Sequence, residues 1–470
     1  MSATATTEKK YLKWYQKLAY GSGDLASNCS YGLVSSFVLL YLTGTLGLDS
    51  AIIGSLMLAS KVLDGISDVI FGTLIDRTHS KLGKARPWML FGQVGVSLCL
   101  FLLFAIPAGS TTMQYIYFFI VYTALNAVFY TANGIAYSSL VALITKNNNE
   151  RVQLGSFRFM FAVVTNIFMG FAVTGMVEKF GSGAAGWRTT ALIFAIVGLV
   201  VNTISCLAVK ELPEKELSDN TSEAAEEGKA VAEEKKHGFA ETAKILVHNK
   251  YYLMILAIYI VYYIMSNLTT GAGVFCATYY WGDGSLLGQF SMMKMFPVII
   301  ALAIAPVLIK KTGSMQKVNF WGYAISSVLG IPMIYFAMQK NLSMFLLFMF
   351  IKGIFAGTLS GSLNALIAEA SGYTTRTTGI HMDGMMYSCS SLGVKVGGGI
   401  GTAAVGWLLK LGGFVGTATV QSESAIRMIF NLYITFPFVI GIIITVLLAF
   451  LDVEKANKKW DAEHKKEAQA

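Results

Sequence analysis

Two carboxylates that lie four residues apart are the strongest sign of chemistry in this chain of 470 residues. Asp64 and Asp68 lie within the stretch 51–76, which is long and apolar enough to cross a membrane. A spacing of four residues places both side chains on one face of a helix. Acidic groups at membrane depth are costly unless something compensates them, so this pair is a candidate functional site. Their repulsion is relieved by a bound Na⁺ or by a proton on one of them.

Basic residues lie on both sides of this acidic pair. Lys61 precedes Asp64 by three residues, so a static Lys61–Asp64 ion pair is the alternative to cation binding. A basic cluster follows the stretch, comprising Arg77, Lys81, Lys84 and Arg86. Lys and Arg concentrate in cytoplasmic loops, so this cluster marks the cytoplasmic end of the helix. An embedded acidic pair beside a basic cytoplasmic loop is typical of a cation-coupled transporter.

The composition indicates a membrane protein with many spans. The chain is 54% hydrophobic and only 13% charged, whereas about a quarter of the residues of a soluble protein are charged. The net charge of +9 comes from Lys and Arg in short loops, which is the positive-inside pattern and not a nucleic-acid-binding stripe. The five cysteines lack metal-type spacing, and no nucleophile or metal cluster is evident. We therefore expect neither an enzyme nor a bound cofactor, and the lipid bilayer as a partner.

The apolar runs predict an all-α membrane protein with twelve transmembrane helices. We expect them at 18–46, 51–76, 88–108, 113–144, 152–178, 187–209, 250–281, 286–310, 317–338, 343–370, 379–411 and 427–451. An even number of spans puts both termini on one side. The basic loops place that side in the cytoplasm, which predicts a multi-pass protein of the inner (plasma) membrane.

A polar, charged segment divides the chain into halves. Residues 211–249 are poor in aromatic residues and predict a cytoplasmic linker. We expect a six-helix bundle at 1–210, a second at 250–452, and a cytoplasmic tail at 453–470. The basic loop after the second span has a shorter counterpart at 310–317, after the eighth. Such internal repetition is typical of transporters that are built from two repeats.

Several motifs resemble one transporter family. The string Asp64-Gly-Ile-Ser-Asp68, followed by Asp76-Arg-Thr and Arg86-Pro87, resembles the glycoside–pentoside–hexuronide:cation symporters, the melibiose-permease family of the major facilitator superfamily. Further matches are Tyr20-Gly-Ser-Gly-Asp24, Tyr137-Ser-Ser-Leu, Glu150-Arg151 and Lys395-x-Gly397. The resemblance implies the major facilitator fold, two six-helix bundles around a central cavity that opens alternately to either side. It also implies that the span-two carboxylates bind the coupling cation.

The resemblance also implies a sugar site formed by spans one, four and five. Asn28 and Asn133 match positions that are aspartates in the melibiose permease, and Tyr137 stands where a relative has Trp. Arg158 is expected to bind sugar hydroxyls or to offset the acidic pair, and Lys395 to pair with the same carboxylates. Ser67 stands where many members of the family have Asn in span two. This difference leaves both Na⁺ and H⁺ open as the coupling ion.

The charge balance of the spans favours an anionic sugar. Two carboxylates are missing at Asn28 and Asn133, while Lys294 and Lys352 lie within predicted spans. If these lysines face the cavity they can pair with a uronate, so we expect a glucuronide or hexuronide as substrate. The alternative is that both lysines extend outward to the membrane surface. A symporter of a neutral glycoside or pentoside stays open, and a lysolipid carrier is a more distant alternative within the same fold family.

Overall fold

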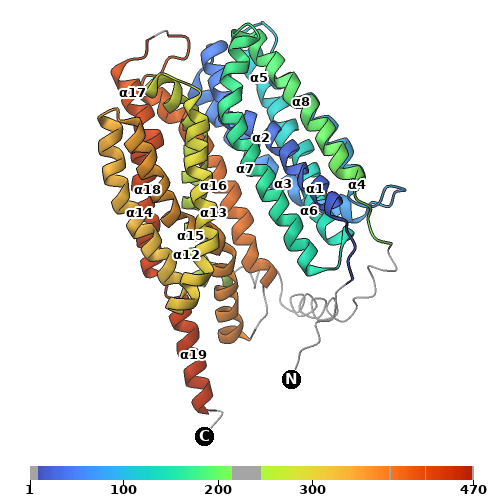
Figure 1. The fold of residues 1–470 in the computed structure, drawn as a ribbon, viewed down its shortest axis with the longest axis vertical. Coiled ribbons are helices and arrows are strands. Elements are labelled where there is room, and N and C mark those ends of the chain that lie inside the picture. Colours follow the sequence, from blue (N-terminus) through green and yellow to red (C-terminus); the bar gives the residue numbers. More distant parts are fainter. Residues whose placement is uncertain (1–8, 214–244, 380–382, 419, 468–470) are drawn as a thin grey trace. The chain divides into compact units, whose positions relative to one another are not determined.

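The computed structural model describes residues 9–213, 245–379, 383–418 and 420–467, and within these ranges every regular element is a helix (Figure 1). The helices of the first half are α1 (Trp14–Gly21), α2 (Gly23–Leu40), η1 (Tyr41–Thr45), α3 (Ser50–Asp76), α4 (Arg86–Leu103), α5 (Thr111–Thr123), η2 (Ala124–Tyr130), α6 (Thr131–Ile144), α7 (Asn148–Lys179) and α8 (Gly183–Leu207). Those of the second half are α12 (Lys250–Phe275), η3 (Cys276–Trp281), α13 (Leu286–Thr312), α14 (Met315–Met338), α15 (Leu342–Thr378), α16 (Asp383–Leu411), α17 (Glu423–Phe430), η4 (Asn431–Thr435), α18 (Phe436–Phe450) and α19 (Val453–Glu467). The elements labelled η are single π-helical turns.

The described helices match the predicted membrane spans. Eleven continuous helical stretches are long and apolar enough to cross a bilayer. The stretch missing from these eleven is α3, which has 27 residues but carries Lys61, Asp64 and Asp68. With α3 included, the described chain has the twelve crossings that the sequence predicts. The charged residues that keep α3 out of the eleven apolar stretches are the same residues that make it a candidate functional site.

The described chain forms two compact units. The first holds residues 9–213, 277–288 and 406–425, and the second holds 245–276, 289–405 and 426–467. The segment 406–425 comes late in the sequence but belongs to the first unit, because Ser50 Oγ donates to the Gly406 carbonyl at 2.9 Å and Lys410 Nζ lies 2.5 Å from Asp49 Oδ2. Burial raises the pKa of Asp49, but the Lys410 contact and two backbone N–H groups lower it by more. Most of the predicted linker 211–249 lies outside the described residues.

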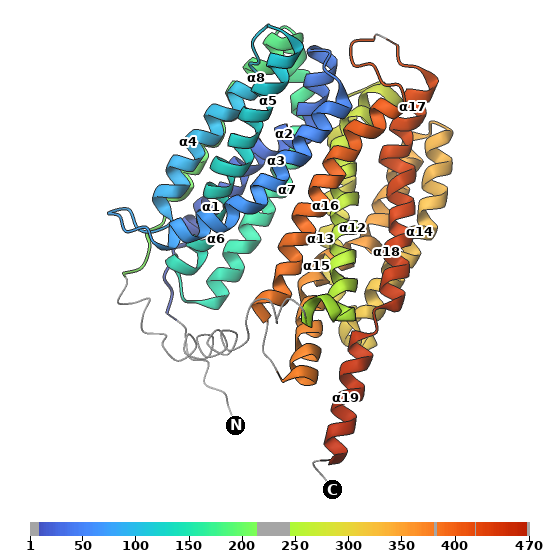
Figure 2. The same ribbon diagram turned by 180° about the vertical axis from the view of Figure 1, so that it is seen from behind.

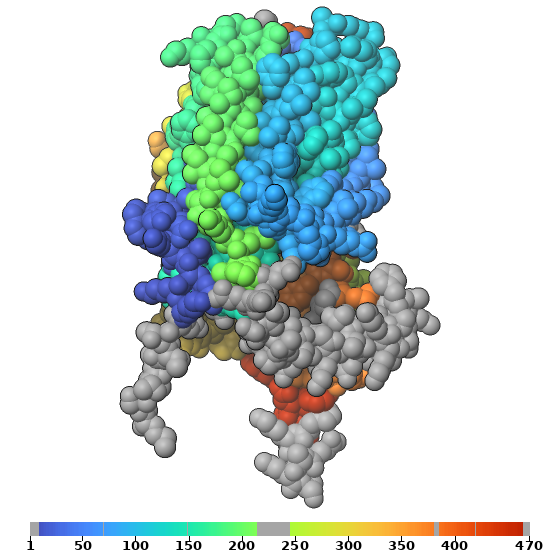
Figure 3. Space-filling view, turned by 90° about the vertical axis from the view of Figure 1, so that its right-hand side faces the viewer, coloured from blue at the N-terminus to red at the C-terminus, as the bar shows by residue number. Residues whose placement is uncertain are grey.

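In the first unit, α4 and α8 pack side by side along their length (Figures 2 and 3). Their outward faces are apolar and exposed, for example Phe91 (72%) and Leu98 (57%) on α4 and Ile196 (53%) and Ile204 (54%) on α8. A soluble protein rarely exposes so continuous an apolar face. The face is therefore the surface that contacts the lipid.

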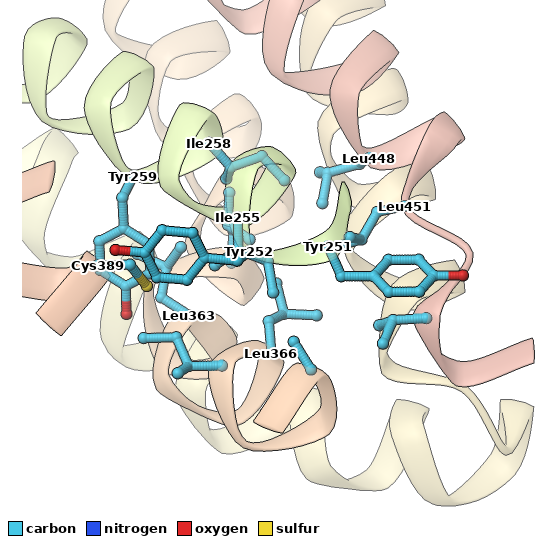
Figure 4. Packing of buried hydrophobic residues seen from close by; sticks show 14 of the residues in the cluster. Tyr251, Tyr252, Ile255, Ile258, Tyr259, Leu363, Leu366, Cys389, Leu448 and Leu451 are labelled. Atoms are coloured by element: carbon cyan, nitrogen blue, oxygen red, sulfur yellow. The ribbon is translucent and has the colours of Figure 1, made fainter. Parts of the chain in front are cut away.

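The core of the second unit lies between α12, α15, α16 and α18 (Figure 4). Ile255 and Ile258 of α12 are buried against Leu363 and Leu366 of α15, and Leu448 of α18 closes the cluster. Aliphatic side chains of α12, α15 and α18 thus pack these helices together.

A repeated carboxylate contact reveals the internal symmetry of the chain. Glu211 lies four residues beyond the end of α8, and its oxygens accept the backbone N–H groups of Lys84, Ala85 and Arg86 at 2.7–3.1 Å. Glu454 lies four residues beyond the end of α18 and accepts those of Met315 and Gln316 at 2.8 and 3.0 Å. Each carboxylate satisfies the free N–H groups at one helix N-terminus and complements its dipole. The capped helix α4 follows the basic loop after the second span, and the capped helix α14 begins within the similar stretch 310–317.

Replacing Glu454 by Gln should lower the stability of the protein. The side chain is 8% exposed, and the amide removes the charge together with one acceptor oxygen. We expect a loss of about 1–2 kcal/mol, seen as a lower thermal unfolding midpoint in detergent. Glu463→Gln, at an exposed site on the same helix α19, is the matched control and should leave the midpoint unchanged. Equal midpoints for the two variants would contradict this role.

Candidate functional site

Asp64 is the most enclosed acidic group of α3, with 9% of its surface exposed. Lys61 Nζ lies 3.5 Å from its Oδ2, and the same ammonium lies 6.0 Å from the centre of the Tyr31 ring. Thr131 Oγ1 lies 2.6 Å from the other carboxylate oxygen. One cationic and one hydroxyl group therefore compensate the buried charge. The Lys61 contact follows from the three-residue spacing, whereas Thr131 comes from a distant part of the chain.

A π-helical turn places Thr131 beside Asp64. The turn η2 ends at Tyr130, and Thr131 directs both its backbone N–H and its hydroxyl to the Asn126 carbonyl, the latter at 2.9 Å. The hydroxyl has one hydrogen and two acceptors within reach, the Asn126 carbonyl and Asp64. If the Asp64 carboxyl group is protonated, it can donate its hydrogen to the Thr131 hydroxyl, and that hydroxyl can then donate to the Asn126 carbonyl. The site can thus hold a proton on Asp64 with the Thr131 hydroxyl and the Asn126 carbonyl both hydrogen-bonded.

Asp68 lies one turn further along α3 and is half-buried, while Lys395 lies on α16 and is also half-buried. Ser67, the residue that departs from the family pattern, donates its hydroxyl to the backbone carbonyl of Asp64 at 2.9 Å. The predicted joint action of Lys395 with the two carboxylates stays a prediction.

A second polar cluster joins α2, α6 and α7. Arg158 Nε lies 2.6 Å from Asp24 Oδ2, and the guanidinium lies 4.1 Å from the centre of the Tyr137 ring. The side chains of Arg158 and Asp24 are 25% and 17% exposed, so the pair is largely withdrawn from solvent. The Tyr137 hydroxyl donates to the Tyr20 carbonyl at 2.8 Å. This close approach requires Gly23, where a Cβ would lie 2.8 Å from the Tyr137 ring.

Asn28 extends this cluster along α2. Its Nδ2 donates to the Asp24 carbonyl at 2.7 Å, and its Oδ1 accepts from Asn166 Nδ2 of α7 at 2.9 Å. Arg158, Tyr137 and Asn28, three of the four predicted sugar-binding residues, are therefore brought together. A cation and two amides form a set that can bind sugar hydroxyls. The Tyr137 ring is 2% exposed and lies between Arg158 and Tyr20, so in this structure it supports the guanidinium and does not stack on a sugar ring.

The structure places Asn133, the fourth predicted residue, away from this cluster. Asn133 is 3% exposed and donates from Nδ2 to the Met89 carbonyl at 2.8 Å, with Gln93 Oε1 at 3.4 Å. The side chain faces α4, so in this structure it holds α6 against α4. The family position alone could not reveal this orientation.

Lys294 and Lys352 line a cavity of about 180 Å³ inside the second unit. They lie about 12 and 15 Å along the helix axis from the first residues of α13 and α15, at 1.5 Å per residue. Lys294 Nζ lies 3.2 Å from Thr269 Oγ1 and 3.3 Å from Thr270 Oγ1. No residue that lines this cavity, in the part of the chain that the structure describes, carries a carboxylate. Both lysines thus face the interior of their unit, not the lipid.

Sequence reasoning did not single out Asp24, Thr131 or Asn166 as members of the site. Asp24 lies 134 positions before its partner Arg158, and Thr131 lies 67 positions after Asp64. Helical periodicity reports only neighbours within one helix. A usable signal for Asp24 was its place in an apolar span together with an embedded Arg, since such charges usually occur in pairs.

Comparison with known proteins agrees with this architecture. A family model described as MFS/sugar transport protein matches residues 19–455. The isoprimeverose transporter of Lactiplantibacillus pentosus is 26% identical over 97% of this chain and 92% of its own length. The glucuronide carrier protein homolog of Escherichia coli (strain K12) is 23% identical over 86% of this chain and 85% of its own length. A putative 2,3-dihydroxypropane-1-sulfonate exporter of the same strain is 26% identical over 93% and 92%.

Solved structures share the fold at low sequence identity. A D-xylose–proton symporter has a TM-score of 0.64 at 12% identity, over 94% of this chain and 98% of the other. A bacterial homolog of the lysosomal transporter Spinster has a TM-score of 0.69 at 13% identity, over 95% and 98%. The predicted fold and the resemblance drawn from the span-two motif are both confirmed. The chain belongs to the MFS/sugar transport protein family and is a transporter, not an enzyme.

Proposed function

We propose that this protein carries a sugar or glycoside across the membrane in symport with a cation, and that it prefers an anionic sugar such as a glucuronide or hexuronide. The observation that carries the proposal is the enclosed Asp64 carboxylate of α3, whose Oδ1 lies 2.6 Å from the Thr131 hydroxyl. The coupling cation would replace the Lys61 ammonium at Oδ2, which forms the ion pair expected of the alternative, static arrangement. A buried carboxylate with adaptable partners can exchange a cation during a transport cycle. Relatives named as glycoside/cation symporter and glucuronide carrier homolog support the same class of substrate.

The hydrogen-bond geometry at Asp64 supports a proton as the coupling ion. Thr131 has two acceptors for its one hydrogen, and a proton on Asp64 completes the chain to the Asn126 carbonyl. Na⁺ is the second candidate, with Asp68 as a further source of oxygen ligands. We also propose that both termini face the cytoplasm of the inner membrane, because the loop after α3 carries Arg77, Lys81 and Lys84.

The charge distribution supports an anionic substrate. Asn28 carries no charge, and Asp24 is already paired with Arg158. Lys294 and Lys352 then contribute positive charge in a cavity whose described lining has no carboxylate. The second candidate is a neutral glycoside, which the relative named isoprimeverose transporter favours.

Uptake into membrane vesicles tests the proposed function. With an inward proton gradient and no Na⁺, labelled phenyl β-D-glucuronide should accumulate more than labelled phenyl β-D-glucoside. Lys294→Met should reduce glucuronide uptake selectively, whereas Lys311→Met, an exposed site on the same helix α13, should not. Equal accumulation of both compounds by the native protein would contradict the anionic preference. Accumulation that needs Na⁺ and ignores the proton gradient would contradict proton coupling.

Replacing Arg158 by Lys should weaken glycoside binding. Lysine keeps the charge beside Asp24 but loses the planar group that lies over the Tyr137 ring. We expect the dissociation constant to rise about tenfold, equivalent to about 1.4 kcal/mol. Arg151→Lys on the same helix is the control, since Arg151 Nε donates to the Thr145 carbonyl outside the cluster. Equilibrium dialysis with the labelled glycoside measures both constants. Unchanged binding by the Arg158 variant would remove this residue from the sugar site.

A further inference from the structure

The cavity of the second unit has a mixed lining that suits the charged end of a ligand. Lys294 and Lys352 are its charged residues, Ser266 and Thr269 add hydroxyl groups, and Met349 and Phe345 represent the apolar remainder. Two amines and several hydroxyl groups therefore share the wall of this cavity with apolar side chains. Small apolar sites with a few convergent polar groups are the usual form of a ligand site.

The size of the cavity limits what it can hold. On this measure one water molecule needs about 10–15 Å³, and sites for drug-sized ligands are about 300–1,000 Å³. A volume of about 180 Å³ lies between these values. It is ample for a carboxylate or sulfonate with the carbons that carry it.

The two amines cannot both be charged at low cost while the cavity is empty. Each ammonium group in this apolar-lined space loses hydration, and no carboxylate lines the described part of the cavity to offset its charge. Lys294 is the better stabilised of the two, because its ammonium reaches the hydroxyls of Thr269 and Thr270. Lys352 has no such hydrogen bond among the described residues. Lys352 is therefore the amine that gives up a proton first.

We propose that this cavity captures the anionic group of the substrate together with one proton, which Lys352 takes from water. The inference rests on the proposed anionic preference and adds a second coupling site to it. The bound anion offsets both ammonium charges, so anion and proton each strengthen the binding of the other. When the anion leaves, the buried Lys352 ammonium again lacks a counter-charge and releases its proton to water. The only covalent change is the N–H bond that forms and later breaks.

This arrangement affects the energetics of transport. An anion that moves with a single coupling cation carries no net charge and gains nothing from the membrane potential. The additional proton on Lys352 restores one net positive charge to the loaded carrier. The other titratable groups of the cavity are Tyr262 on α12, Tyr323 on α14 and Tyr433 on η4. These phenols are neutral at physiological pH, so they do not replace the lysine in this role.

Calorimetry of the purified full-length protein tests the inference. Titration in two buffers of different ionisation enthalpy gives the number of protons taken up per ligand bound. The probes are p-nitrophenyl β-D-glucuronide and p-nitrophenyl β-D-glucoside, because their difference cancels any proton taken up at Asp64. We expect the glucuronide to take up more protons, by up to about one per molecule. Its affinity relative to the glucoside should fall as pH rises, by at most about tenfold per pH unit.

Three variants separate this inference from the proposed function. Lys352→Arg keeps its charge at every accessible pH, so it should bind the glucuronide without the additional proton. Lys352→Met should bind it at least tenfold more weakly, and the control Lys311→Met should behave as the native protein does.

The contrary outcomes distinguish proton capture by Lys352 from the preference for an anionic sugar. Glucuronide binding by the native protein with no more proton uptake than the glucoside overturns proton capture and leaves the anionic preference standing. Failure of the native protein to bind the glucuronide overturns both claims. Retention of the additional proton by Lys352→Arg would remove Lys352 from this role.

Discussion

The cost of a charge in an apolar surrounding is the constraint on which this structure depends. Within the first unit the embedded charges are compensated at close range, Asp64 by Lys61 and Arg158 by Asp24. In the second unit the described residues around Lys294 and Lys352 offer hydroxyls but no carboxylate. In the proposed function the first unit therefore holds a cation or a proton at Asp64, whereas the second is completed by an anion. The cost of an uncompensated charge thus accounts for cation binding in one half of the repeated fold and anion binding in the other.

Local departures from regular helix geometry place the functional groups. The π-helical turn before Thr131 directs its hydroxyl to Asp64, and such turns often occur at functional sites. Gly23 lets the ring of Tyr137 approach the backbone of α2 closely, which sets the aromatic face under Arg158. The first feature is a shift in helix register, and the second is a position where a Cβ would lie 2.8 Å from the Tyr137 ring. The capping carboxylates Glu211 and Glu454 meanwhile fix the loops at equivalent places in the two halves.

Much of this architecture could be predicted from the sequence because it is encoded locally. Span lengths follow from apolar runs, and the Lys61–Asp64 contact follows from a spacing of three residues. The contacts between helices could not be predicted in this way. Asp24 and Arg158 are 134 positions apart, and no periodicity within one helix relates them. Asn133 shows that a matching position in a family does not determine where a side chain points. The resemblance implied a sugar contact for this residue, but its side chain faces α4.

The central claim is that occupancy of Asp64 by a cation controls sugar binding. For a neutral glycoside, a cation that moves with it down a potential of 100 mV supplies about 2.3 kcal/mol, enough for roughly fifty-fold accumulation, only if such control exists. The most direct measurement is the affinity of purified native protein and of Asp64→Asn for a neutral glucoside, across pH and with or without Na⁺. A neutral probe leaves the lysine cavity out of the comparison. The account predicts a cation-dependent affinity in the native protein and a constant one in Asp64→Asn. An unchanged cation dependence in Asp64→Asn would contradict it.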